Sequence, residues 1–260
     1  MLKAGIFVDV DNIMRNGGNG MNYRRLRELV EAQGARVVRA NTYAAYDEEY
    51  ESQDRDRKAR RDTARAAIRR EGYNVVLKPT RKYENREGGV TVKSNVDLDI
   101  AVDALIQAQN LDYVLLVSGD GDYIKLVKAL QSQGKRVDVL GFSNVSGELK
   151  RECDYFWSGY LVPGIVPPPK DDPNVQTGFL HYADEAKGFG FITMYTGLKA
   201  GEYRDDVYVH ITDVKDENGV TVANTAFGSL FRRQAVLEFD LETQANGKPI
   251  AKRVVELKFS

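Results

Sequence analysis

The chain has 260 residues, 42% of them hydrophobic and 29% charged, as expected for a folded protein with one large domain or two smaller ones. It has a single cysteine, Cys153, and two histidines, which excludes an internal disulfide and a cysteine-rich zinc site, so any metal must be held by oxygen ligands. The net charge of −1 argues against attraction of nucleic acid by the whole surface, although not by a local basic patch. The apolar run at the amino terminus is broken by Asp9, and no stretch is long enough for a membrane span. We therefore expect a cytoplasmic protein without a membrane partner.

The first part of the chain alternates between apolar runs and amphipathic segments. Strands are predicted at 4–10, 35–44, 73–79, 113–118 and 135–142, and helices at 23–34, 54–70, 95–109 and 121–134. The first run, "AGIFVDV", is continuously apolar, which is typical of a strand buried on both faces. This alternation predicts an α/β fold, with a parallel sheet covered by helices on both faces.

A proline-rich segment divides the chain. Residues 161–177 hold five of the seven prolines, which predicts a semi-rigid linker between a first domain at 1–160 and a second at 178–260. The second domain has short alternating runs separated by Gly, Asp and Asn turns. This pattern predicts a small all-β barrel or sandwich of about five strands.

Polar residues cluster where predicted strands of the first domain end and where one helix begins. They are Asp9, Asp11 and Asn12 after the first strand, Asp97 at the start of the 95–109 helix, and Ser118, Asp120 and Asp122 after the 113–118 strand. Open α/β sheets build their sites at the carboxyl ends of strands, so we expect these groups to converge. Each acid alone also fits a helix cap or a first-turn residue. Together they would repel one another without a cation, which favours a hard divalent metal ion.

Three segments carry a family resemblance: "IFVDVDNI", "KSNVDLDIAVDAL" and "YVLLVSGDGDYIKLVKALQSQGKRVDVLGF". Over residues 3–160 the chain resembles the NYN domain, a branch of the PIN-like nuclease superfamily. The resemblance implies a ribonuclease that uses Mg²⁺ or Mn²⁺. It puts the metal-binding acids at Asp9, Asp97, Asp120 and Asp122, and further polar site positions at Asn12 and Ser118. The family has a lysine and a glycine before the acid that corresponds to Asp97. This sequence departs from that pattern and has Lys93, Ser94 and Asn95 there.

Two alternatives remain at this point. The "DVD" after the first strand also resembles the start of a haloacid-dehalogenase-type phosphatase, with Asp9 as nucleophile and Asp11 as acid/base. That family needs a Ser/Thr and a lysine at further positions, for which Thr42 and Lys78 are candidates without convincing context. The other alternative is a non-catalytic RNA-binding regulator, in which the acidic domain keeps its fold but no longer catalyses cleavage.

Basic residues gather in two stretches of the first domain. Residues 51–70 hold eight Lys/Arg against four Asp/Glu, and residues 78–93 hold five against two. Such runs fit a solvated helix face, and equally a phosphate-contacting rim beside the acids. Arg81, Lys82 and Arg86 lie in a Gly-containing segment that could close over a substrate.

Aromatic residues alternate in the second domain. In "KGFGFI", Phe189 and Phe191 point to one side of a strand, and in "VYVHI" Tyr208 and His210 do the same. Because valines and an isoleucine already supply the opposite face of "VYVHI", we expect the aromatic side to face outward. With Tyr182 from a third strand it would form a platform on which bases stack.

This second part, over residues 177–260, resembles the cold-shock domain, an OB-fold that binds single-stranded nucleic acid. Its two ribonucleoprotein motifs match "KGFGFI" and "VYVHI", while Tyr182 stands in place of a tryptophan and the preceding lysine is lost. The expected nucleic-acid-binding residues are Tyr182, Lys187, Phe189, Phe191, Tyr208, His210 and the loop aromatic Phe227, with Arg81 and Lys82 from the first domain. Together the two resemblances predict a metal-dependent ribonuclease that cleaves single-stranded or unstructured RNA. The pattern does not separate RNA from DNA, because contacts to the 2′-hydroxyl are not readable from it.

Overall fold

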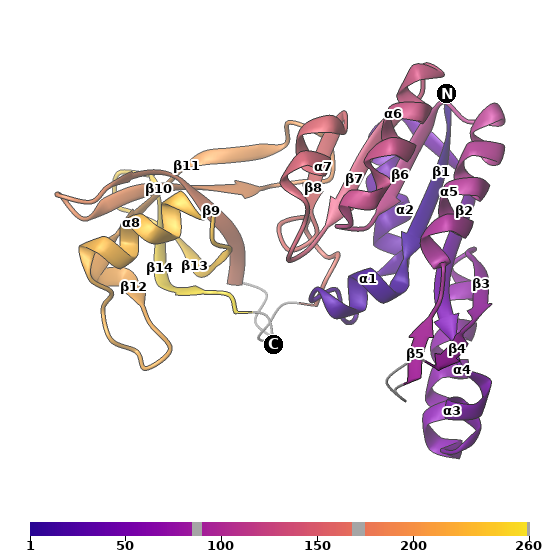
Figure 1. Cartoon of the computed structure of the whole chain (residues 1–260). Helices are drawn as coiled ribbons and strands as arrows, with labels where there is room; N and C mark the ends of the chain where they lie inside the picture. The colour runs from indigo at the N-terminus through magenta and orange to yellow at the C-terminus, as the bar shows by residue number, and fades with distance from the viewer. Residues whose placement is uncertain (85–89, 168–174, 259–260) are drawn as a thin grey trace. The chain divides into compact units, whose positions relative to one another are not determined.

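The computed structural model describes residues 1–84, 90–167 and 175–258. The chain divides into two compact units, an N-terminal unit, Met1–Ser158, and a C-terminal unit, Gly159–Ser260, each with its own hydrophobic core. Figure 1 shows the elements of each unit. Of the expected linker, residues 168–174 lie outside the described residues.

The N-terminal unit is built on a parallel sheet. Its strands, in the order β3-β2-β1-β6-β7-β8, are β1 (Leu2–Asp9), β2 (Ala35–Tyr46), β3 (Asn74–Pro79), β6 (Tyr113–Val117), β7 (Arg136–Gly141) and β8 (Tyr155–Ser158). A separate antiparallel hairpin joins β4 (Arg81–Glu84) to β5 (Val90–Lys93). The helices are α1 (Val10–Arg15), α2 (Tyr23–Ala32), α3 (Glu48–Ser52), α4 (Arg55–Arg70), α5 (Val96–Gln107), α6 (Ile124–Ser132) and α7 (Gly147–Glu152), with short 3-10 turns η1 (Ala108–Asn110) and η2 (Gly121–Tyr123). Among the described helices, none combines the length and the apolar content that crossing a membrane would require.

Helices cover both faces of this sheet, as the sequence predicts (Figure 1). One face packs on α5 and α6, where Phe7 and Leu116 from the strands share a buried cluster with Ile100 and Val127 from the helices. Successive strand residues point to opposite faces of a sheet. The residues next to Phe7 in β1 and next to Leu116 in β6 therefore point to the opposite face, and they are buried as well. The other face is covered by α2, which buries an apolar stripe beginning at Leu26. Burial on both faces explains the continuous apolar run in β1.

The parallel arrangement gathers several chain segments at one edge of the sheet. β1 ends at Asp9 and its neighbour β6 ends at Val117, so the residues that follow them meet at the same carboxyl edge. β2 pairs with β1 on the other side and leads at that edge into α3 and α4. The candidate acids and the basic helix therefore belong to one end of the unit.

The C-terminal unit is a closed five-stranded barrel. Its strands are β9 (Val175–Asp184), β10 (Phe189–Tyr195), β11 (Tyr203–His210), β13 (Leu237–Thr243) and β14 (Pro249–Glu256), in the order β11-β10-β9-β13-β14. A parallel pairing of β11 with β14 closes the barrel, and the short β12 (Val214–Lys215) lies beside β14. This arrangement is OB-like, and it confirms the predicted fold class.

One sequence prediction in this unit is wrong. Phe227 was expected as a loop aromatic that contacts nucleic acid, but it lies in a helix, α8 (Asn224–Arg232), with none of its surface exposed. Its ring packs in the barrel core against Gly190, where an added Cβ would come within 3.2 Å of it. Phe227 and Leu230 are buried three residues apart on the inner side of α8. Phe227 is therefore a core residue.

Candidate active site and aromatic surface

Asp9 is the buried acid of the carboxyl edge, with 7% of its surface exposed. One carboxylate oxygen accepts from the Asn12 backbone amide at 3.0 Å, which caps α1, and the other accepts from the Tyr123 hydroxyl at 3.1 Å. Burial raises the pKa of Asp9, the two hydrogen bonds offset part of this effect, and the charges of Asp11 and Asp120 raise it further. Asp9 is a carboxylate held in place where negative charge accumulates.

Tyr123 bonds Asp9 and lies within reach of the charges of two other acids. Burial raises the pKa of its phenol, followed by the charge and hydrogen bond of Asp9 and by the charges of Asp97 and Asp120. The phenol therefore stays protonated and donates to Asp9. Asp120 also caps η2, because it accepts from the Asp122 amide at 3.0 Å. Asp120 therefore caps η2 and also belongs to the group of acids.

Asn12 and Ser118 tie the strand ends together. The Asn12 side-chain oxygen accepts from the Gly119 amide at 2.9 Å, which joins the segment after β1 to the segment after β6. Ser118 is fully buried, and its hydroxyl accepts from the Asp120 amide at 3.2 Å. These contacts fix the backbone that carries the acids.

The remaining two acids are more open. Asp97 is exposed in the first turn of α5, and Asp122 is exposed in η2. Within the described residues, no three Asp, Glu, His or Cys side chains are gathered closely enough to hold a metal ion. The donors themselves, carboxylate oxygens that repel one another, suit a hard cation such as Mg²⁺ or Mn²⁺. The donor chemistry fits, although the side chains do not form a ready three-ligand group.

The sequence did not point to Tyr123. It directly follows "GDGD", so its position was a usable signal, but a tyrosine at the start of an amphipathic segment is read first as core. Lys78, a residue considered for the phosphatase alternative, bonds both oxygens of Asp99 at 2.6 and 2.7 Å. Thr42, the other one, is buried with 1% of its surface exposed. The phosphatase alternative gains no support from these contacts.

An aromatic row crosses three strands of the barrel. In the register, Phe191 lies opposite Tyr208 on β11 and opposite Tyr182 on β9, while Phe189 lies opposite His210. The ring centroids of Tyr182, Phe189, Phe191 and Tyr208 lie 6.0–6.2 Å apart in five pairs. Tyr182 is 45% exposed and the other three rings are half-buried, whereas the valines on either side of Tyr208 are fully buried. The row lies on the outside of the barrel.

Polar groups border this row. The ring of His181 stacks on Phe191 with centroids 6.4 Å apart, and its Nδ1 lies 3.0 Å from the Thr193 hydroxyl. His210 is half-buried, and Lys187 keeps 75% of its side chain exposed. The side chains of Arg81 and Lys82, and all of Arg86, lie outside the described residues. The described border thus combines imidazole rings with one exposed cation.

Comparison with known proteins identifies the N-terminal unit. The NYN domain family matches residues 3–161, and the chain belongs to this family, as its sequence motifs predicted. NYN domains are part of the PIN-like nuclease superfamily, which supports a nuclease or RNA-related function at the level of the family.

Two individual proteins show more distant likeness. The low amplitude and bright protein LabA of Synechococcus elongatus is 24% identical over 88 residues, which are 33% of this chain. The match spans about half the length of that curated relative, 47%. A crystal structure of a protein of unknown function from Vibrio parahaemolyticus is 31% identical with a TM-score of 0.48, covering 60% of this chain and 91% of that one.

Proposed function

We propose that this protein is a metal-dependent ribonuclease that cleaves single-stranded or unstructured RNA. The observation that carries the proposal is the buried Asp9, whose pKa is raised by burial and by neighbouring carboxylates at the carboxyl edge of a NYN domain. Perturbed acids of this kind concentrate at catalytic sites. The nuclease superfamily to which NYN domains belong gives the reaction class.

The acids and their partners have separate tasks in this proposal. Asp9, Asp97, Asp120 and Asp122 would hold one or two Mg²⁺ or Mn²⁺ ions. When bound, such an ion lowers the pKa of a water molecule and stabilises charge on the scissile phosphate. The Tyr123 hydroxyl orients the Asp9 carboxylate by donating to it at 3.1 Å, and Asn12 holds the strand ends in register.

The barrel would capture the strand, as a cold-shock-like domain does. Four rings from three adjacent strands form an outward row, and bases stacking on such rings contribute roughly 1–3 kcal/mol each without demanding a sequence. Lys187 would contribute charge toward the phosphates. The barrel then supplies affinity, and the acids supply the chemistry.

The test is degradation of an unstructured RNA oligomer, with a DNA oligomer of the same sequence alongside. Wild type is compared with Asp9→Asn, with Mn²⁺ or Mg²⁺ present or removed by chelator. Asp112→Asn is the matched control, because Asp112 precedes β6 at the opposite edge of the sheet and accepts from the Lys3 amide. We expect cleavage by wild type and by the control only with metal, and none by Asp9→Asn. Equal degradation by wild type and Asp9→Asn would overturn the proposal.

A second function is favoured by the spacing of the acids. In the part of the chain that the structure describes they do not form a three-ligand group, while four aromatic rings form a row on the outside of the barrel. A non-catalytic RNA-binding regulator would combine these two features. It predicts RNA binding that depends on Phe189 and Phe191, with no cleavage under any metal condition.

A further inference from the structure

α4 is a long helix that buries almost nothing. Its 16 residues include eight Lys/Arg and two Asp, and none of them is buried. Most helices of this length are stabilised by packing of an apolar face, which α4 lacks. Its only large apolar residue, Ile68, is half-buried. Something other than hydrophobic packing must hold α4 in place.

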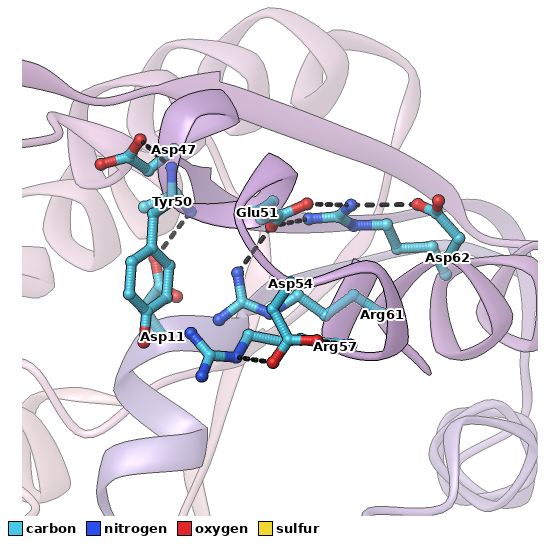
Figure 2. A network of polar contacts seen from close by, with 10 residues as sticks. Asp11, Asp47, Tyr50, Glu51, Asp54, Arg57, Arg61 and Asp62 are labelled. Carbon is cyan, nitrogen blue, oxygen red and sulfur yellow. Dashed lines mark hydrogen bonds and ion pairs between the residues drawn. The ribbon is translucent and has the colours of Figure 1, made fainter. Parts of the chain in front are cut away.

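An ionic anchor does this on one side of the helix. Glu51 of α3 is 1% exposed and accepts from Arg61 at 2.6 Å and from Arg65 at 2.7 and 2.9 Å (Figure 2). Asp54 caps the helix and pairs with Arg57 at 3.6 Å. The three arginines are spaced four residues apart, so they lie on the same side of α4. Their charges are therefore used within the protein.

The other cations of α4 are differently placed. They are Arg55, Lys58, Arg60, Arg69 and Arg70, and all five are exposed. None of the five forms an ion pair with a carboxylate of the described residues. At 3.6 residues per turn, Arg55, Lys58 and Arg69 fall on one side of the helix, next to the row of anchored arginines. Asp62, which pairs with Arg65, lies on the same side, so this side carries three exposed cations against one carboxylate.

The fold sets this charge beside the acidic edge. α3 and α4 follow β2 at its carboxyl end, and Figure 1 shows both at that end of the sheet. The Ala45 amide near the end of β2 donates to Asp11 at 2.7 Å, two residues beyond Asp9. If the scissile phosphate of an RNA chain reached the acids, further phosphates of the same RNA would lie at this end of the unit, where α4 begins.

We infer that the side of α4 formed by Arg55, Lys58 and Arg69 binds the phosphate backbone of the RNA strand. This inference rests on the proposed function, because it assigns a second contact to the same substrate. A protein partner fits less well, since protein interfaces have an apolar centre that this side lacks. A membrane surface also fits less well, because interfacial helices insert an apolar face.

The test measures binding, on the full chain with Asp9→Asn included in every variant to prevent cleavage. The triple variant Arg55→Gln, Lys58→Gln, Arg69→Gln is compared with Lys3→Gln, Arg36→Gln, Lys135→Gln. The control triple removes the same charge at the amino ends of β1, β2 and β7, the opposite edge of the sheet. Affinity for an unstructured RNA oligomer is followed as a function of salt concentration. Melting temperatures of both triples should match the parent, because the α4 cations make no ion pairs with carboxylates of the described residues.

Each phosphate contact to a single strand contributes about 0.7 to the slope of log K against log salt concentration. We therefore expect the α4 triple to reduce the magnitude of that slope by about 2, and the control triple to leave it unchanged. Equal slopes for the two triples would overturn the inference. A loss confined to binding of polyglutamate would overturn it as well, and would assign α4 to an acidic protein partner.

Failure of the inference is distinguishable from failure of the proposed function. If Phe189→Ala weakens binding and the α4 triple does not, the barrel captures RNA alone and only the inference fails. If the α4 triple lowers the slope while the wild-type chain cleaves no RNA with any metal, the α4 surface stands and the ribonuclease proposal fails.

Discussion

Asp9 both caps a helix and belongs to the proposed active site. Its carboxylate caps α1 through the Asn12 amide and accepts from Tyr123, yet burial and neighbouring acids raise its pKa. The carboxyl-edge rule was sufficient to expect Asp9 and Asp120 near one another, because β1 and β6 are adjacent strands. The contribution of Tyr123 depends on the direction of its hydroxyl, which is set by how η2 packs against α5 and α7 and has no signature in the sequence.

Removal of the Tyr123 hydroxyl tests its positioning role. Tyr123→Phe leaves the ring in the core and deletes the donor to Asp9. Loss of such an orienting partner costs about 10–100-fold in metal affinity or activity, so we expect the Mn²⁺ concentration for half-maximal cleavage to rise by that factor. Tyr113→Phe is the matched control, because Tyr113 is equally buried and donates to Asp138 at 2.9 Å. An unchanged Mn²⁺ requirement in Tyr123→Phe would contradict the role given to this hydroxyl.

Two phenylalanines of the barrel should separate stability from binding. Phe227 lies fully in the core, so Phe227→Ala should lower the free energy of unfolding by about 3–5 kcal/mol. Phe189 lies in the outward row, so Phe189→Ala should weaken single-strand binding roughly 5- to 150-fold with a smaller loss of stability. Thermal melting and RNA titration of both variants check this. A large loss of melting temperature with unchanged RNA affinity in Phe189→Ala would make Phe189 a core residue.

At the scale of elements, the long strands and helices follow from periodicity, and the short ones do not. The 54–70 helix was predicted and is α4 (Arg55–Arg70), whereas α1, α3 and α7 have five or six residues each and are too short to show a period. α8 was not predicted, and Phe227 was taken for a loop residue because the cold-shock resemblance put a loop aromatic at this position. The Glu51 anchor joins residues 10 and 14 positions apart across a turn, so only the structure reveals it.

The Glu51 anchor gives a prediction about pH. Burial alone would raise the pKa of Glu51, but the hydrogen bonds from Arg65 and Arg61 outweigh it and hold the pKa below the usual 4.5. A lowered pKa in the folded state stabilises the fold at pH values above 4.5, and this contribution is lost as pH falls through the lowered value. We expect Glu51→Gln to unfold more easily than wild type at neutral pH, by on the order of 1–3 kcal/mol, with the difference shrinking in acid.

Denaturant unfolding at several pH values measures this effect. Glu28→Gln is the control, because Glu28 forms exposed pairs with Arg24 and Arg25 on α2, and such pairs contribute little. If the Glu51→Gln difference persisted unchanged into acid, the ionic account of how α4 is held would be incorrect.

For the whole molecule, the proposed cleavage site and the proposed RNA-binding surface belong to different units. The NYN match covers residues 3–161, and the aromatic row belongs entirely to the C-terminal unit. The net charge of −1 hides a strong local difference, since α4 alone has six more cations than anions among its 16 residues. Composition of the whole chain therefore says little about binding of nucleic acid, and the placement of charge on particular elements says more.

We propose that the acids cut RNA which the barrel holds. The most direct test is single-turnover cleavage of an end-labelled, unstructured RNA with Mn²⁺, together with its affinity, for wild type, Asp9→Asn and Phe189→Ala. We predict that Asp9→Asn binds as tightly as wild type without cleaving. We predict that Phe189→Ala binds more weakly and cleaves at the wild-type rate once saturated. Cleavage by Asp9→Asn at the wild-type rate, or wild-type affinity in Phe189→Ala, would contradict this division of roles.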